Sequence, residues 1–132
     1  MYIMRFIFII LGLFSWTICA KAQDVNWSED IAPIIFNNCT ECHRQGEIGP
    51  MPFTNYGEVA GYGSLIEFVT SSGYMPPWTP EPGYGQLAGE RTLSPEEIEL
   101  ISAWVDAGMP QGDPALQPPL PEFPEGSQGR CA

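Results

Sequence analysis

The chain has 132 residues, a formal net charge of −11 at pH 7 and 44% hydrophobic residues. This length suits one domain with one modest core. The excess of 16 acidic over five basic residues argues against nucleic acid or an anionic membrane surface as partner. It favours a basic or neutral docking partner, although acidity also serves simply to keep a protein in solution.

Residues 1–22 have the pattern of a secretory signal peptide. Arg5 supplies a positive charge, residues 6–14 form an apolar run, and residues 20–22 read small-x-small, as a cleavage site does. The run is shorter than the roughly 20 residues that span a bilayer, so we expect no transmembrane segment in the mature chain. The bulky residue before Cys19 argues against lipoprotein processing. We therefore expect a periplasmic or secreted protein.

The first helix is predicted to begin at Asp30 as N-cap, with Pro33 in its first turn, where a missing N–H costs little. Trp27, just before it, is interpreted as a packing residue. The apolar face of this helix consists of Ile31, Ile34 and Ile35. That face leads directly into the next feature of the chain.

Residues 39–43 read Cys-Thr-Glu-Cys-His, the Cys-x-x-Cys-His attachment signature of c-type haem. In this signature two thiols add to the haem vinyl groups and the adjacent imidazole takes the iron. Residues three apart share one helical face, so Cys39 and Cys42 can meet one porphyrin edge, with His43 under the iron. Haem c is attached outside the bacterial cytoplasm, so the signal peptide and the motif support each other.

Three other interpretations of the motif compete with haem attachment. A structural zinc site needs four N or S ligands, and the chain has one His and only two cysteines outside the motif, Cys19 and Cys131. A thioredoxin-like pair requires a βαβ context that the flanking sequence lacks. A plain disulfide between Cys39 and Cys42 is possible but leaves His43 without a role.

The loop from residue 45 to 52 is marked by glycines and prolines. A metal-bound His usually donates its second ring N–H to a carbonyl, and a loop shortly after the motif can supply that acceptor. The carbonyl of Pro50 is our candidate, although Gly-Pro is also common in ordinary turns.

Helical material is predicted between Thr54 and Ser72, interrupted by glycines that each cost about 1 kcal/mol relative to Ala. We expect two short helices or one bent helix, with residues 64–71 as the clearer half and Gly73 as its end.

Tyr-Met-Pro-Pro-Trp follows at residues 74–78. A Pro-stiffened loop can present a thioether as the sixth ligand of a haem iron, although a Met in a loop is normally core filler. Met51 follows His43 too closely to reach the opposite haem face, and Met109 lies beyond the last helix, so Met75 is the predicted axial ligand. Trp78 is expected to pack on the haem.

The last helix has the clearest boundaries. Ser94 is the predicted N-cap, Pro95 the first helical residue, Glu97 completes a capping box, and Gly108 ends the helix. Its predicted core face consists of Ile98, Ile101, Trp104 and Val105. Arg91, ahead of this helix, is a candidate partner for a haem propionate or for neighbouring acids.

Residues 113–132 are rich in proline and are predicted to form a flexible tail or linker. Cys131 in this segment is an odd thiol in an exported protein. The predicted organisation is therefore a signal peptide over 1–22, one helical domain over 23–112 and the tail.

With these motifs in place, residues 28–112 resemble a class I mono-haem cytochrome c domain, particularly bacterial domains that read Ala-Pro-Ile, Met-Pro-Pro-Trp and Trp-Val-Asp-x-Gly. Here these motifs lie at residues 32–34, 75–78 and 104–108. The resemblance implies a small all-α fold of three to four short helices and long Gly/Pro loops around one haem. It also implies covalent haem c on Cys39 and Cys42, with His43 and Met75 as axial ligands. The segment between His43 and Met75 is short for the family, and the lysine ring of mitochondrial relatives is absent.

The expected function is single-electron transfer to and from a redox partner protein, without chemistry on a substrate, so we do not expect an enzyme. Two alternatives stay open. The domain is a haem sensor or ligand-binding module if the sixth position is labile, and an electron-entry module if it serves a partner oxidoreductase.

Overall fold

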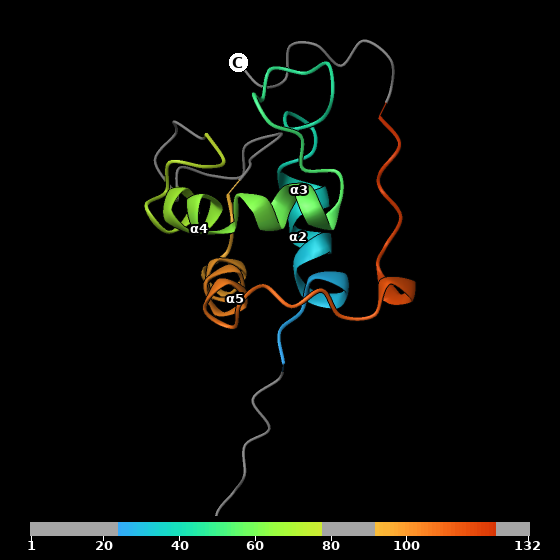
Figure 1. The fold of residues 1–132 in the computed structure, drawn as a ribbon. Helices are drawn as coiled ribbons and strands as arrows, with labels where there is room; N and C mark the ends of the chain where they lie inside the picture. Colours follow the sequence, from blue (N-terminus) through green and yellow to red (C-terminus); the bar gives the residue numbers. More distant parts are fainter. Residues whose placement is uncertain (1–23, 78–91, 124–132) are drawn as a thin grey trace, which may run out of the picture.

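A computed structural model of the chain describes residues 24–77 and 92–123. In order, it contains a π-helical turn η1 (Trp27–Ile31), the α-helices α2 (Ala32–Asn38), α3 (Tyr56–Gly61), α4 (Gly63–Ser71) and α5 (Pro95–Asp106), and a 3₁₀ turn η2 (Pro114–Leu116). Over these two ranges the protein has no strand, so the predicted all-α class is confirmed there. Figure 1 shows α5 below α4, on which it packs, while α2 follows directly on η1.

The first helical segment begins one turn earlier than predicted. Asn26, not Asp30, is the N-cap, and its side-chain oxygen accepts from the Glu29 N–H. Asp30 lies inside the turn, where its carboxylate accepts the Asn26 N–H at 2.8 Å. This reciprocal pair satisfies two of the donors that a helix start leaves open, so the chain becomes helical from Trp27 onward.

The glycines between residues 54 and 72 divide the chain into two helices, as predicted. Helix α3 ends at Gly61 and α4 begins at Gly63, with Tyr62 between them. Gly63 is buried, and a Cβ built on it would lie 2.3 Å from the sulfur of Met109. Gly73 follows α4 at φ +70°, a left-handed conformation that glycine adopts without strain.

Helix α5 confirms the predicted caps at both ends. Ser94 and Glu97 form the capping box, with Pro95 at the first helical position. At the other end, Gly108 has φ +82° and its N–H reaches the Val105 carbonyl, while the Met109 N–H reaches the Trp104 carbonyl. These two bonds make a Schellman motif, which satisfies carbonyls that the helix end would leave open.

The core lies where η1, α2 and α5 meet. Trp27 and Trp104 are both fully buried with ring centroids 6.2 Å apart, and Trp27 also meets Phe36 edge-on at 5.7 Å. The other buried apolar side chains are Ile31, Ala32, Ile34, Ile35, Phe53, Val59, Ile66 and Ile101. The predicted packing role of Trp27 is therefore confirmed. Helix α5 packs on both η1 and α4.

Residues 110–123, which we name the C-terminal strap, lie against the helices. The Pro110 carbonyl accepts both the Trp27 backbone N–H and the Trp104 indole N–H, at 2.9 Å each. The Gln117 side chain accepts the Trp27 indole N–H at 2.7 Å. The strap then runs along one side of the molecule toward the loop after α2 (Figure 1). Up to residue 123 this differs from the expected flexible tail, because buried indole N–H groups need these acceptors.

Candidate functional site

The Cys-x-x-Cys-His motif begins where α2 ends, as predicted. Asn38 is the last helical residue and Cys39 the C-cap. The Cys39 carbonyl accepts the N–H of both Cys42, at 3.1 Å, and His43, at 2.8 Å. These bonds fold residues 39–43 into one further turn that continues directly from α2.

The His43 ring is held by the loop that follows it. Its Nδ1 lies 3.0 Å from the backbone carbonyl of Met51, so the prediction of Pro50 as acceptor was off by one residue. Pro50 instead lies exposed at the turn before this carbonyl. A carbonyl only accepts, so Nδ1 is the donor in this contact, and in the neutral ring the lone pair then lies on Nε2. This tautomer is the one that binds a metal through Nε2.

Two residues missed by the sequence analysis shape the space around the imidazole. Phe53 stacks on the ring with a centroid distance of 4.6 Å and an interplanar angle of 17°. Gly49 passes so close that an added Cβ would lie 2.7 Å from His43 Nδ1 and 2.6 Å from the Cys42 carbonyl oxygen. Gly49 in the loop was a visible signal, but only the fold shows that it faces the ring.

The two motif cysteines differ. Cys39 is a free thiol, and its pKa is raised to about 12 by burial, with the negative charge of Glu97 adding to the effect. Cys42 is disulfide-bonded, and Cys39 is not its partner. The two sulfurs are therefore not equivalent, because Cys39 is a thiol and Cys42 is part of a disulfide.

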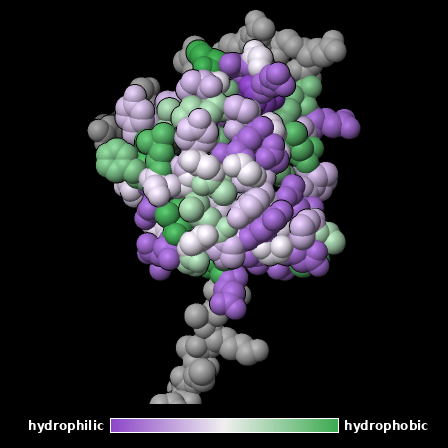
Figure 2. Space-filling model, viewed as in Figure 1, coloured by the Kyte–Doolittle hydropathy of each residue, from purple (hydrophilic) through white to green (hydrophobic). Residues whose placement is uncertain are grey.

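Met75 lies just beyond the end of α4. Its N–H and that of Tyr74 both reach the Val69 carbonyl, at 2.9 Å, which anchors the start of the Pro-rich loop to the helix. Nearby apolar side chains are unusually exposed, Phe68 at 68% and Tyr74 at 71%. Figure 2 shows apolar side chains gathered on the surface over α4. The other candidate sulfurs, Met51 and Met109, both pack on the core.

Two predicted site residues, Trp78 and Arg91, lie outside the described residues. Among those that are described, no three His, Cys, Asp or Glu side chains gather as a metal-binding group. None of the helices described is long and apolar enough to cross a membrane. Comparison with protein-family models, with characterised proteins and with solved structures returns no match for this chain.

Proposed function

We propose that the chain is an exported c-type cytochrome that carries single electrons through one covalently attached haem. The observation that carries this proposal is the Cys-x-x-Cys-His turn together with the 3.0 Å contact between His43 Nδ1 and the Met51 carbonyl. The motif supplies the two thiols and the imidazole. The contact fixes the tautomer in which Nε2 is ready for iron.

The exposed apolar side chains near Met75 support a haem-binding surface beside this residue. Large apolar side chains such as Phe68 and Tyr74 seldom stand in water beside a conformationally restricted loop without a partner. A haem face is apolar, flat and large enough to cover them. We assign Met75 as the second axial ligand, because it follows Tyr74 directly and is half-buried.

Each residue then has a defined role. Cys39 and Cys42 would hold the haem covalently, and His43 and Met75 would hold its iron. Haem, when bound, supplies a one-electron Fe(III)/Fe(II) couple, which takes an electron from a donor protein and passes it to an acceptor. The chain itself keeps water from the imidazole through Phe53, fixes the ring through Met51, and offers a soft sulfur ligand that favours the reduced iron.

The disulfide on Cys42 sets one requirement. A sulfur in a disulfide cannot add to a vinyl group, so attachment requires Cys42 as a thiol, with the two electrons and two protons supplied by an external dithiol reductant through thiol–disulfide exchange. The acidic surface, with Arg44 as the only Lys or Arg among the described residues, fits a redox partner whose docking face is basic or neutral. We further propose periplasmic or secreted export through residues 1–22, where haem c is attached.

Intact mass of the protein exported from cells equipped for c-type haem maturation, measured after denaturation, tests the covalent bond. We expect the mass of the mature chain plus one haem. Cys39→Ala and Cys42→Ala should each reduce the fraction of chains that carry haem, whereas Cys131→Ser, which removes a cysteine outside the motif, should leave that fraction unchanged. Loss of haem from Cys131→Ser alone would contradict the assignment, and chain mass without haem in every variant would refute the proposal.

A further inference from the structure

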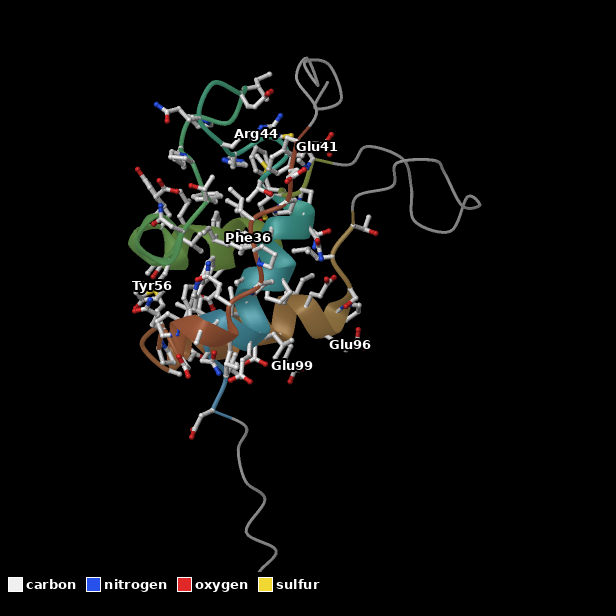
Figure 3. All side chains as sticks on the ribbon, turned by 90° about the vertical axis from the view of Figure 1, so that its right-hand side faces the viewer. Phe36, Glu41, Arg44, Tyr56, Glu96 and Glu99 are labelled. Atoms are coloured by element: carbon white, nitrogen blue, oxygen red, sulfur yellow. The ribbon has the colours of Figure 1, made fainter. Side chains whose placement is uncertain are left out.

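Arg44, the residue after the motif, forms hydrogen bonds with three nearby residues. Its Nη1 donates to the Thr40 carbonyl at 3.2 Å and to the Glu41 carbonyl, and its Nη2 donates to Glu47 Oε1 at 2.8 Å. Only 13% of the Arg44 side-chain surface is exposed to solvent, so protein groups replace most of the water around it. Figure 3 shows Arg44 and Glu41 together at the end of the molecule.

Thr40 and Glu41 are the two residues between the motif cysteines, and they lie in the turn that continues α2. Carbonyls at the end of a helical segment lack the N–H partners of the next turn, and an Arg side chain can supply them. Arg44 therefore closes the motif turn from outside, while the Met51 carbonyl holds the His43 ring.

The face of the same guanidinium is covered from a distant part of the chain. The Phe123 ring, at the end of the C-terminal strap, lies with its centroid 4.1 Å from Arg44 Cζ, a cation–π contact. The other end of the strap is fixed to the start of the helical part, where the Ser28 N–H and hydroxyl both donate to the Gln111 carbonyl at 3.0 and 2.9 Å. The strap thus links η1 to the motif turn.

We infer that Arg44 is a positioning residue that couples docking of the C-terminal strap to the turn that carries His43. With Phe123 in place, the guanidinium is shielded from water and its bonds to the Thr40 and Glu41 carbonyls are strengthened. When Phe123 leaves, water competes for the guanidinium and the turn opens more readily. An effect on iron ligation rests on the proposed function, whereas the coupling itself does not.

Amide hydrogen exchange on the full chain, haem-free and with its disulfides reduced, tests the coupling directly. The reporters are the N–H groups of Cys42 and His43, bonded to the Cys39 carbonyl, and of Gly49, bonded to the Cys42 carbonyl. Phe123→Ala should speed their exchange roughly two- to thirtyfold, the range expected for loss of one cation–π contact. Exchange within α5 should stay unchanged, which shows that the variant is folded.

Two matched variants complete the experiment. Phe123→Tyr keeps a ring over the guanidinium and should restore the wild-type exchange rates. Leu120→Ala truncates an exposed side chain of the same strap and should leave the reporters unchanged. Equal reporter rates in Phe123→Ala and wild type, or equal acceleration by Leu120→Ala, would overturn the inference. Because the measurement needs no haem, failure of haem attachment contradicts the proposed function and not this coupling.

Discussion

The backbone carbonyl of Met51 lies 3.0 Å from Nδ1 of His43, and Gly49 is the residue that lets the loop come this close. The same loop donates the Gly49 N–H to the Cys42 carbonyl at 2.9 Å and the Phe53 N–H to the His43 carbonyl at 2.9 Å. The loop therefore binds the backbone of Cys42 and His43 as well as the imidazole itself, and the geometry of the ring depends on it.

Gly49→Ala should displace either the loop or the His43 ring. Its Cβ would lie 2.6 Å from a backbone oxygen and 2.7 Å from a ring nitrogen, so we expect a loss of about 1–3 kcal/mol in the free energy of unfolding. Urea denaturation of the full chain measures this. Gly61→Ala is the control, since its Cβ meets nothing within 4 Å and should be neutral or stabilising by up to about 1 kcal/mol. Equal stability of the two variants would contradict the packing argument.

Gln117→Leu should destabilise the protein by about 1–3 kcal/mol, because it leaves the Trp27 indole N–H buried without its 2.7 Å acceptor. For a domain of this size that corresponds to a fall of roughly 4–8 °C in Tm per kcal/mol, measured by thermal unfolding. Gln111→Ala is the control variant and should leave Tm nearly unchanged. Gln111 contacts Ser28 through its backbone carbonyl, and its side chain is exposed. If Gln111→Ala lowered Tm as much, the strap would not act through these specific bonds.

Cys39 should react slowly with iodoacetamide in the folded, haem-free chain. With a pKa of about 12 in place of 9.0, its thiolate fraction at pH 8 is about a thousandfold lower than that of an ordinary thiol. Peptide mapping of the alkylated, disulfide-reduced chain gives the rate, and the same chain in denaturant is the reference. Glu97→Gln keeps the capping box but removes the negative charge, so it should speed the reaction. An unchanged rate would mean that the Glu97 charge does not act on the thiol.

The same pKa sets a pH dependence of stability for the haem-free chain. Between pH 9 and 12 the unfolded chain releases the Cys39 proton while the folded chain retains it, so the free energy of unfolding should fall as pH rises through this window. The stabilising effect is complete below pH 9. Cys39→Ala should remove this slope, and denaturant titrations at several pH values would detect it. A slope that persists in Cys39→Ala would assign the effect to other groups.

Met75→Ala should leave haem attached but lower the reduction potential and admit carbon monoxide to the reduced iron, because a His/Met pair favours the reduced state. Met51→Leu is the control, since it keeps the Met51 backbone carbonyl and nearly the same side-chain volume. Redox titration and carbon monoxide difference spectra measure both. Carbon monoxide binding by the wild-type protein at neutral pH would instead favour the sensor alternative.

Local signals in the sequence predicted most of the helices. The Ser94 and Glu97 capping box, the glycine break between α3 and α4 and the left-handed Gly108 all depend on neighbouring residues only, and each was confirmed. The start of the first helix was missed because Asn26 and Asp30 are both good caps. In the structure Asn26 caps by accepting the Glu29 N–H, and Asp30 lies inside the turn and accepts the Asn26 N–H.

The parts that the sequence did not predict depend on contacts between distant residues. Proline-rich composition indicated a free tail, but Gln117 satisfies the indole of Trp27 and Phe123 covers Arg44, and neither pairing has a local signal. Within the candidate site, the sequence correctly predicted that a backbone carbonyl of the loop accepts from His43. It did not predict that this carbonyl belongs to Met51, which depends on how closely Gly49 passes the ring. Composition and motif spacing do not indicate which distant residues come into contact.

The most direct test of the central claim is the absorption spectrum, oxidised and reduced, of the protein exported from cells equipped for c-type haem maturation. We predict c-type bands that survive denaturation, and a Met–iron charge-transfer band in the native oxidised protein that disappears in Met75→Ala. A colourless protein would refute the haem assignment and leave Cys39 and Cys42 to thiol or disulfide chemistry.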